Sequence, residues 1–329
     1  MQEKSNHPSL KRTVIAFVFL LLSVLCFGCK KRGKPEIILQ REWIANAEFV
    51  GDLQASRLAA EEGWVLTVLE GSEIQDPVQE VRSERAHFGV ASADRVLKEN
   101  ELGANLAIIA TATPKSPVVF LGHASDILRD PHDFIGKSVG IQSGTNTELV
   151  FEALVLMNNL DRSKIDVLES GWGTGEFTSG QVQILAAFDY DEPVQLDEKK
   201  FPYKKLYPAD HRVDFIGTVY FTRRELIKND PTTVAKFVQV LVRGWDHALD
   251  QQQDAIEYLF NTFPENIDPE KESRSLSVGE KYFKDDNGTL LYASRSRWEA
   301  MAEVLKRMDY LKNFQFEKNI DYSFLEQAH

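Results

Sequence analysis

The sequence is poor in cysteine, because its 329 residues include only Cys26 and Cys29, both near the N-terminus. The rest of the chain therefore has no cysteine pair for a disulfide framework and no thiolate for a metal site. Its seven histidines show no paired spacing typical of zinc ligands. No Gly-x-Ser-x-Gly motif marks a serine nucleophile. These absences predict a protein that is not an enzyme, with no catalytic residues, no metal site and no cofactor.

Basic residues are also scarce relative to acidic ones. The chain has 38 Lys and Arg against 50 Asp and Glu, a formal net charge of −12. A general nucleic-acid binder needs a basic surface to neutralise phosphates, so we expect no nucleic-acid partner. The charge is no guide to a small-molecule ligand.

The N-terminal segment has the pattern of a targeting signal. Basic residues precede the apolar run Val14–Phe27, which is short for a membrane span and leads into Gly28-Cys29. The pattern resembles a bacterial lipoprotein signal, with residues 1–28 as signal peptide and Cys29 as the lipidated first residue. Residues 29–35 would form a basic tether beside the membrane. A plain signal peptide or an uncleaved anchor is the alternative, and each alternative predicts an exported protein.

The chain after this segment predicts an α/β fold. Short apolar runs typical of buried parallel strands alternate with helical patterns. We expect lobe I to begin with residues 36–125, lobe II to comprise 126–212, and 213–329 to return to lobe I and add C-terminal helices. A cleft between two such lobes is a usual small-molecule site. The polar segment Ser273–Asn287 is expected to be a long surface loop.

The segment Gly136–Glu148 predicts a strand, a Ser-Gly-Thr turn and the start of a helix. Backbone N–H groups and the side chains of Ser143, Thr145 and Asn146 would face one point there. Such a turn suits a carboxylate, phosphate, sulfonate or polar ring edge. The alternative is that Ser143 or Thr145 only caps the helix.

Aromatic residues stand where predicted strands end. Trp43 follows the first strand, with Asn46 three residues later, and Tyr190 follows the strand Ile184–Phe188. Strand ends of parallel sheets face the ligand crevice, so these rings suit a flat heterocycle. Trp172, on a glycine-rich loop, could close over the same ligand. The alternatives are a core Trp43, a merely flexible loop and a solvated helix start after Tyr190.

The order and spacing of several motifs carry a family resemblance from about Ile37 to Leu325. These motifs are Trp43-Ile-Ala-Asn46-Ala-Glu-Phe, Phe88-Gly-Val-Ala-Ser92, Ser116-Pro117, Asp133-Phe-Ile-Gly136-Lys-Ser-Val-Gly-Ile-Gln-Ser-Gly144-Thr, Tyr190-Asp-Glu192-Pro193, Val242-Arg-Gly-Trp245 and Arg297-Trp298. The chain resembles the periplasmic solute-binding proteins of ABC importers, in the NMT-like branch that binds the pyrimidine precursor of thiamine. That branch is similar to the sulfonate-, nitrate- and riboflavin-binding proteins and to the fungal thiamine-pyrimidine synthase.

The resemblance implies a two-lobed type II periplasmic binding protein with a ligand cleft between the lobes. It implies a lipid-anchored receptor that captures an aminopyrimidine and delivers it to an ABC permease and ATPase. Trp43 and Tyr190 would flank the ring, Asn46 and Glu192 would bond its polar edge, and Ser116 with the 143–146 turn would hold its substituent. The complete expected ligand set is Trp43, Asn46, Ser92, Ser116, Ser143, Thr145, Asn146, Trp172, Tyr190 and Glu192.

The chain also departs from the family pattern. Asp191 stands where Asn is usual, Ala45 replaces Pro, and Gln183 stands where Asp is common. The added negative charge at Asp191 favours a cationic or amine-bearing ligand and disfavours sulfonate and nitrate. The synthase branch uses a cysteine-rich stretch and a histidine as sacrificial reagent, which the mature chain lacks. Riboflavin, an aliphatic sulfonate, a synthase-like activity and ligand sensing without transport are the alternatives.

Overall fold

A computed structural model describes residues 36–72 and 75–328. The predicted signal peptide, Cys29 and the tether lie outside these residues. Within the described ranges, no helix combines the length and apolar character needed to cross a bilayer. The chain from Ile37 onward forms one compact unit.

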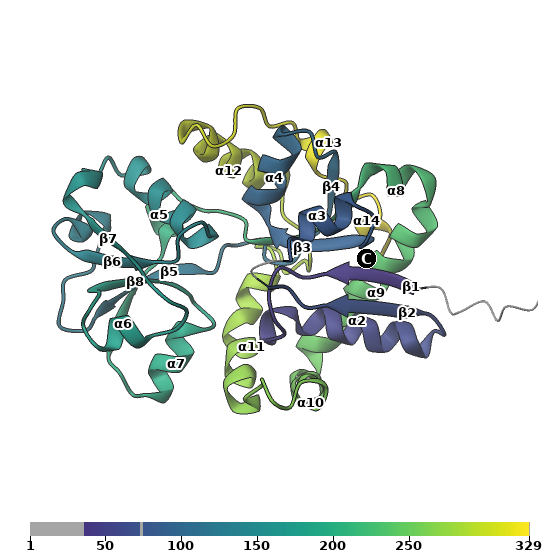
Figure 1. Ribbon diagram of the computed structural model, residues 1–329, viewed down its shortest axis with the longest axis horizontal. Coiled ribbons are helices and arrows are strands. Elements are labelled where there is room, and N and C mark those ends of the chain that lie inside the picture. The colour runs from purple at the N-terminus through teal and green to yellow at the C-terminus, as the bar shows by residue number, and fades with distance from the viewer. Residues whose placement is uncertain (1–35, 73–74, 329) are drawn as a thin grey trace, which may run out of the picture. The chain divides into compact units, whose positions relative to one another are not determined.

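The described residues contain two five-stranded sheets, which Figure 1 shows side by side with helices packed on each. The first has the order β2-β1-β3-β10-β4 and the second the order β7-β6-β8-β5-β9. The first sheet comprises β1 Glu36–Gln40, β2 Val65–Leu69, β3 Phe88–Ser92, β4 Leu106–Thr111 and β10 Thr218–Arg223. The second comprises β5 Val118–His123, β6 Ser138–Ile141, β7 Asp166–Glu169, β8 Ile184–Phe188 and β9 Tyr203–Leu206.

Both sheets are mixed, so the prediction of a parallel sheet is only partly right. β1 and β3 are parallel, as are β6, β7 and β8, whereas β10 runs antiparallel to β3 and β4. β5 likewise runs antiparallel to β8 and β9. β5 and β10 each enter their sheet from the other lobe without a crossover helix, and a parallel pair normally requires such a crossover. An apolar run predicts a buried strand but does not show its direction.

The boundary between the lobes lies earlier than residue 125, because β5 belongs to the second sheet. The prediction that 36–125 is all lobe I is therefore wrong. The chain crosses between β4 and β5 and returns between β9 and β10. The two crossings bond to each other, with Thr113 N donating to Thr218 O at 3.1 Å, Gly217 N to Thr113 O at 2.9 Å and Ser116 N to Phe215 O at 2.7 Å. These paired segments are the covalent connection between the lobes.

Helices cover both sheets. Those of lobe I are α2 Val50–Glu61, α3 Pro77–Arg82, α4 Ala93–Glu101, α8 Arg224–Asn229, α9 Pro231–Asp250, α10 Gln252–Thr262, α11 Pro269–Phe283, α12 Arg295–Arg307, α13 Phe316–Asn319 and α14 Leu325–Ala328. Those of lobe II are α5 Asn146–Met157, α6 Gly175–Thr178 and α7 Glu192–Glu198. Short 3-10 turns occupy Ala47–Phe49, Pro131–Phe134, Arg162–Lys164 and Pro208–His211.

Helix α11 replaces most of the surface loop predicted at Ser273–Asn287. Its start has a clear signal, because the Asp268 side chain accepts the N–H of Glu270 and Lys271 ahead of a Pro at the first helical position. Asp76 and Asp230 cap α3 and α9 in the same way. The charged, exposed face of α11 obscured its buried one. The error matters because α11 lines the cleft.

The inner strands β5 and β8 of the second sheet are covered on both faces, which explains their near-continuous apolar sequences. Val119 and Leu121 of β5 pack with Leu185 of β8 on one face, while Phe120 and Ala186 join the main core on the other. Successive side chains of a strand point to opposite faces, so such strands have no polar face. With both faces filled, the strand ends are the part of this sheet left open to a ligand.

Candidate ligand-binding site

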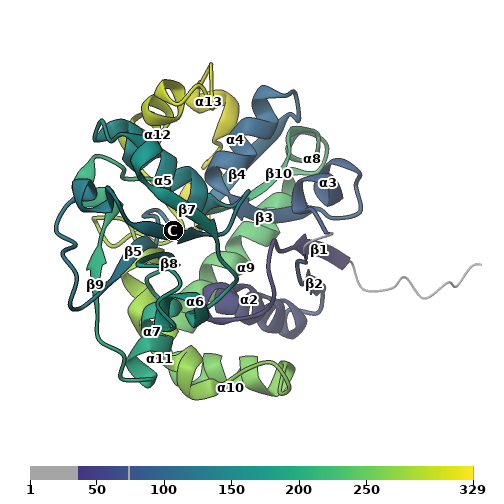
Figure 2. The same cartoon turned by 60° about the vertical axis from the view of Figure 1, so that its left-hand side comes forward.

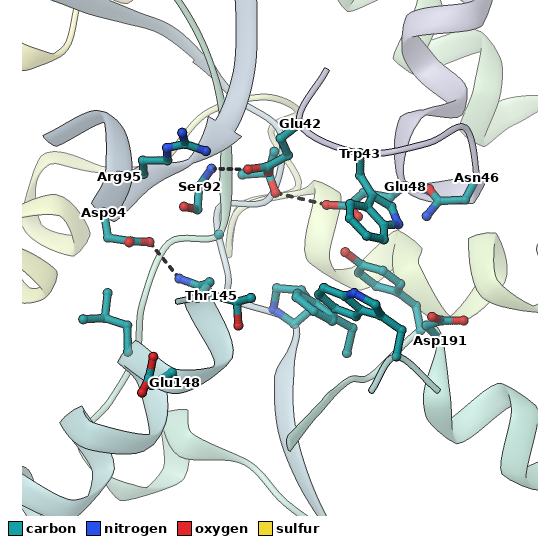
Figure 3. Close-up of a pocket in the computed structure, with 18 of the residues that line it drawn as sticks. Glu42, Trp43, Asn46, Glu48, Ser92, Asp94, Arg95, Thr145, Glu148 and Asp191 are labelled. Carbon is teal, nitrogen blue, oxygen red and sulfur yellow. Dashed lines mark hydrogen bonds between the residues drawn. The ribbon is translucent and has the colours of Figure 1, made fainter. Parts of the chain in front are cut away.

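A cavity of about 790 Å³ lies between the two lobes. In lobe I the cavity is lined by the segments that follow β1 and β3, by α11 and by the segment that follows α12. In lobe II it is lined by the segments that follow β6, β7 and β8. Figure 3 shows side chains from both lobes pointing into this space. Carboxyl ends of parallel strands converge here, the usual place for a ligand in an α/β protein.

Aromatic rings from both lobes meet at one end of the cavity. Trp43 of lobe I and Trp172 of lobe II have ring centroids 4.9 Å apart and planes inclined by 48°. Trp43 is half-buried against the core, whereas 51% of Trp172 is exposed. Gly173, next to Trp172, has a φ of 98°, so the loop bends through a conformation that favours glycine. Tyr190 also lines the cavity and is 5% exposed.

Seven of the ten predicted ligand residues line the cavity. They are Trp43, Asn46, Ser92, Thr145, Asn146, Trp172 and Tyr190. Some of these side chains already have structural partners. Asn46 Oδ1 accepts the N–H of Glu48 at 2.9 Å and caps the turn after β1, and Thr145 Oγ1 donates to Gln142 O at 2.7 Å. Their remaining polar atoms are what a ligand can use.

Ser116, Ser143 and Glu192 are not among the lining residues. Ser116 lies in the first lobe crossing, and its hydroxyl accepts the N–H of Val118 at 3.3 Å. Glu192 is 2% exposed, because it begins α7 and turns back to accept the N–H of Phe188 at 2.9 Å. The structure therefore does not bring Glu192 to the polar edge of a bound ring. Ser143 is exposed outside the cavity.

Two N–H groups of the turn after β6 are satisfied by carboxylates of the protein. Ser143 N donates to Glu169 Oε1 at 3.3 Å, and Gly144 N donates to Glu148 Oε2 at 2.7 Å. An anionic ligand at this turn would have to displace a carboxylate from each donor. The arrangement disfavours the carboxylate, phosphate or sulfonate that an open turn would accept.

Three carboxylates in the cavity were missed by sequence reasoning. Glu42 follows β1 and accepts the N–H of Ser92 at 3.1 Å, and Figure 3 shows it between Ser92 and Trp43. Glu48 accepts from the Thr218 hydroxyl at 3.0 Å. Asp94, on α4, is 5% exposed. Single acidic residues near strand ends usually indicate a solvated surface, but here Glu42 and Glu48 are half-buried in the cavity and Asp94 is buried.

Burial raises the pKa of these carboxyls. Desolvation, with the nearby charge of Glu48, raises the pKa of Glu42 to about 8. Desolvation also raises the pKa of Glu48 to about 7, although the Thr218 hydroxyl opposes the shift. The pKa of Asp94 is raised by burial despite its bond to Asn146. A neutralising partner would therefore stabilise the ionised form of the carboxylates in this cavity.

These raised pKa values predict a protein that loses stability as pH rises. Between pH 4.5 and 8 the folded chain keeps protons on Glu42 and Glu48 that the unfolded chain releases, so protons favour the folded state in this window. We expect the Tm of the ligand-free protein to fall on the order of 5 °C between pH 5.5 and 8.5. Thermal melts followed by circular dichroism measure this change, and Glu42→Gln should flatten it. A Tm that stays constant or rises contradicts the prediction.

Polar contacts join the lobes around the cavity. Asn146 Nδ2 of α5 donates to Asp94 Oδ1 of α4 at 2.8 Å. Lys271 of α11 pairs with Asp191 of lobe II at 2.7 Å, and it also lies 3.3 Å from Glu272. Glu272 in turn accepts the N–H of Ala47 at 2.7 Å. The helix missed by the sequence analysis thus ties the segment after β1 to the strand end that carries Tyr190.

A family model described as NMT1/THI5 like matches residues 60–255 of the chain. Riboflavin-binding protein RibY from Chloroflexus aurantiacus is 23% identical over 181 residues, or 54% of this chain and 51% of that protein. The chain thus spans about half the length of this curated relative.

Solved structures show the same fold. The ligand-binding component of an ABC-type import system from Staphylococcus aureus, with zinc bound, has a TM-score of 0.69 and 13% identity, covering 90% of this chain and 99% of that chain. The periplasmic aliphatic sulphonate binding protein SsuA from Escherichia coli has a TM-score of 0.69 and 11% identity. The match covers 89% of this chain and 92% of that chain. The desulfurization enzyme DSZB has a TM-score of 0.61 and 12% identity. The match covers 90% of this chain and 99% of that chain. This fold therefore supports both solute binding and enzyme activity.

The two mixed sheets and the agreement with these structures confirm the predicted fold class, a two-lobed α/β protein of the type II periplasmic binding class. Since the family model matches more than half of the sequence, the chain belongs to the NMT1/THI5-like family.

Proposed function

We propose that this protein is the solute receptor of an ABC importer and is exported to the outer side of a bacterial membrane. A lipid on Cys29 holds it there through the 29–35 tether, and a permease and ATPase receive its ligand. Membership of the NMT1/THI5-like family supports this role, as does a fold shared with the binding components of import systems.

The ligand we propose is a small planar nitrogen heterocycle. The observation that carries this proposal is the meeting of Trp43 and Trp172, from opposite lobes, in a cavity that Tyr190 also lines. Flat rings stack favourably on aromatic faces, and closure of two lobes can bring both faces to one ring. The buried carboxylates supply acceptors for amino and ring N–H groups.

A thiamine pyrimidine precursor is the first candidate within this class. Its aminopyrimidine ring offers an amino group and a ring nitrogen that can be protonated, and a carboxylate can accept from both. Glu192 was expected to fill this role and does not line the cavity. Glu48 and Asp191 both line the cavity near Tyr190 and take over that role in this proposal.

Riboflavin is the second candidate, favoured by two observations. The curated relative is described as a riboflavin-binding protein. The cavity of about 790 Å³ is also roomier than one six-membered ring needs, and it lies within the usual range for sites that enclose larger ligands. A sulfonate is less favoured, because Glu169 and Glu148 already accept the N–H groups of Ser143 and Gly144 in the turn after β6.

Isothermal titration calorimetry and tryptophan fluorescence test this function. The ligands are 4-amino-5-hydroxymethyl-2-methylpyrimidine, its formylated aminomethyl analogue, thiamine, riboflavin and taurine. We expect micromolar or tighter binding of at least one heterocycle, no binding of taurine, and recovery of the ligand unchanged. Binding of taurine alone, or turnover of a bound heterocycle, would overturn the proposal.

The variant Glu192→Gln separates the two accounts of ring recognition. Gln preserves the acceptor for the Phe188 N–H and removes the charge. If the carboxylates that line the cavity recognise the ring, this variant binds within about threefold of the wild type. A loss of tenfold or more would restore the role that the family resemblance gave to Glu192.

A further inference from the structure

The cavity is lined by more acidic than basic side chains. Among the described residues, seven carboxylates line it and two cations, Arg95 and Lys271. Lys271 is already paired with Asp191 and Glu272. Arg95 pairs at 2.7 Å with Asp76, which does not line the cavity. Both cations that line the cavity are therefore already paired with carboxylates.

Glu42 and Glu48 are the carboxylates left without a cation. In the described part of the chain, neither forms an ion pair with a basic side chain. Each accepts one hydrogen bond from a neutral donor, Ser92 N at 3.1 Å for Glu42 and Thr218 Oγ1 at 3.0 Å for Glu48. A desolvated carboxylate is costly unless it is paired or protonated.

A third polar group at this place lacks a well-formed hydrogen bond. Tyr190 is 5% exposed and lines the cavity, and its hydroxyl lies beside Glu48 without a hydrogen bond of good geometry. Burial raises the pKa of the Tyr190 hydroxyl, and the nearby charges of Glu48 and Asp191 raise it further. A buried hydroxyl without a well-formed hydrogen bond is rare in proteins, so it points to a group that a ligand supplies.

From this arrangement we propose that the ligand carries a cationic nitrogen, placed against Glu42 and Glu48 while its flat ring lies on Trp43. The inference rests on the proposed capture of a planar heterocycle and narrows it to rings with a permanent or protonated positive charge. A cation on the ligand neutralises the two carboxylates, and the Tyr190 hydroxyl can bond the ring edge. A neutral ring would leave both carboxylates unpaired or protonated.

The charged groups around the two carboxylates make binding depend on pH. Glu42 faces Glu48 and Asp94, with Arg95 as its nearby cation. Glu48 faces Tyr190, Asp191 and the more deeply buried Asp52. Because burial raises the pKa of Glu42 to about 8 and of Glu48 to about 7, both are largely protonated near pH 6. A permanent cation must displace these protons, so its affinity rises with pH.

A pair of ligands that differ only in charge tests the proposal on the wild-type protein. Thiamine has a permanent thiazolium charge, and its deaza isostere has carbon in place of the charged nitrogen. At pH 7.5 we expect thiamine to bind at least about tenfold more tightly, and its affinity to rise about tenfold or more from pH 6 to 8.5. The isostere should show no such rise. Calorimetry in two buffers of different ionisation enthalpy should show proton release with thiamine.

Charge-neutralising variants locate the effect. Glu42→Gln should weaken thiamine binding about tenfold and leave the isostere within threefold. Glu48→Gln removes a carboxylate that also accepts from the aminopyrimidine ring, so it should weaken both ligands, and both variants should reduce proton release with thiamine. Glu257→Gln, the same change on an exposed position of α10, is the control and should match the wild type. The comparison of ligands on wild-type protein stands even if a variant does not fold.

The remaining outcomes distinguish this inference from the function on which it rests. Equal binding of thiamine and its isostere, or binding of riboflavin alone, would overturn the charge requirement and leave heterocycle capture standing. Failure of every heterocycle would overturn both. Stabilisation by Zn²⁺ alone that is lost in Glu42→Gln would overturn the inference in favour of a metal ion.

Discussion

Replacing Trp43 with alanine is expected to weaken ligand binding about 100-fold. The indole lies at the end of the cavity, is held by the core behind it and faces Trp172 from the other lobe. Removing it takes away one stacking face and opens the site to water. Losses of about 2–3 kcal/mol are typical for a central aromatic anchor, and they correspond to this change in affinity. Calorimetry with the heterocycle bound by the wild type measures the change.

Two companion variants make that result specific. Trp43→Phe keeps a flat ring and should remain within about tenfold of the wild type. Trp172→Ala should cost about tenfold, less than Trp43→Ala, because half of its side chain is exposed on a loop. Unchanged affinity in Trp43→Ala, with a normal circular dichroism spectrum, would remove the aromatic end of the cavity from the proposed site. If Trp43→Ala keeps its affinity and Trp172→Ala alone loses affinity, the ligand is placed on lobe II.

The sequence predicted the strand ends well, because position relative to a buried strand is a local property. Trp43 and Tyr190 directly follow apolar runs that became β1 and β8, and both line the cavity. Asn46 and Thr145 line the cavity as well. What such a pattern cannot resolve is the direction of one side chain. Glu192 lies only two residues after Tyr190, yet the start of α7 turns it into lobe II.

The missed features depend on contacts between distant segments. Glu42 and Asp94 line the cavity between the lobes, and Asp94 accepts hydrogen bonds from Asn146 of lobe II and from Tyr310 of lobe I. Helix α11 was missed because its charges were assigned to solvent. Three of them instead pair with lobe II, at 2.7 Å for Lys271 with Asp191, 2.5 Å for Arg274 with Glu198 and 2.7 Å for Lys281 with Asp189. The strand β5 was recognised, but the sheet that it joins is a property of the whole chain.

The largest expected effect on stability is at Gly244, in the middle of α9. Figures 1 and 2 show α9 alongside α2. A Cβ added at Gly244 would lie 2.5 Å from Ala55 N and from Gly51 O, both backbone atoms of α2. On the facing helix, a Cβ at Gly51 would lie 2.2 Å from the Trp245 ring. The two helices therefore touch backbone to backbone, and this contact has no room for a methyl group.

Gly244→Ala is thus expected to destabilise the protein by about 3 kcal/mol and to lower its Tm by roughly 5–10 °C. Alanine stabilises an isolated helix relative to glycine by about 1 kcal/mol. The sign of the change in Tm therefore shows whether the clash of the added methyl group outweighs this gain in helix propensity. Gly175→Ala is the control, because a Cβ at that helical position meets no atom within 4 Å. Thermal melts should show a lower Tm for Gly244→Ala alone. A Tm equal to the wild type would mean that the helices separate at little cost.

The same contact supports the binding site from behind. Trp245, next to Gly244, donates its indole N–H to the Tyr220 hydroxyl at 2.8 Å, and Tyr220 donates to Asp52 of α2. Asp52 lies 3.3 Å from the fully buried Arg41, the residue before Glu42. Breaking such a buried pair is strongly destabilising, because it leaves an uncompensated charge. The folded fraction of Gly244→Ala should nevertheless bind ligand within about threefold of the wild type, since the substitution lies outside the cavity. Low stability with near-normal affinity would therefore distinguish a fault in the helix contact from the loss of a ligand contact in Trp43→Ala.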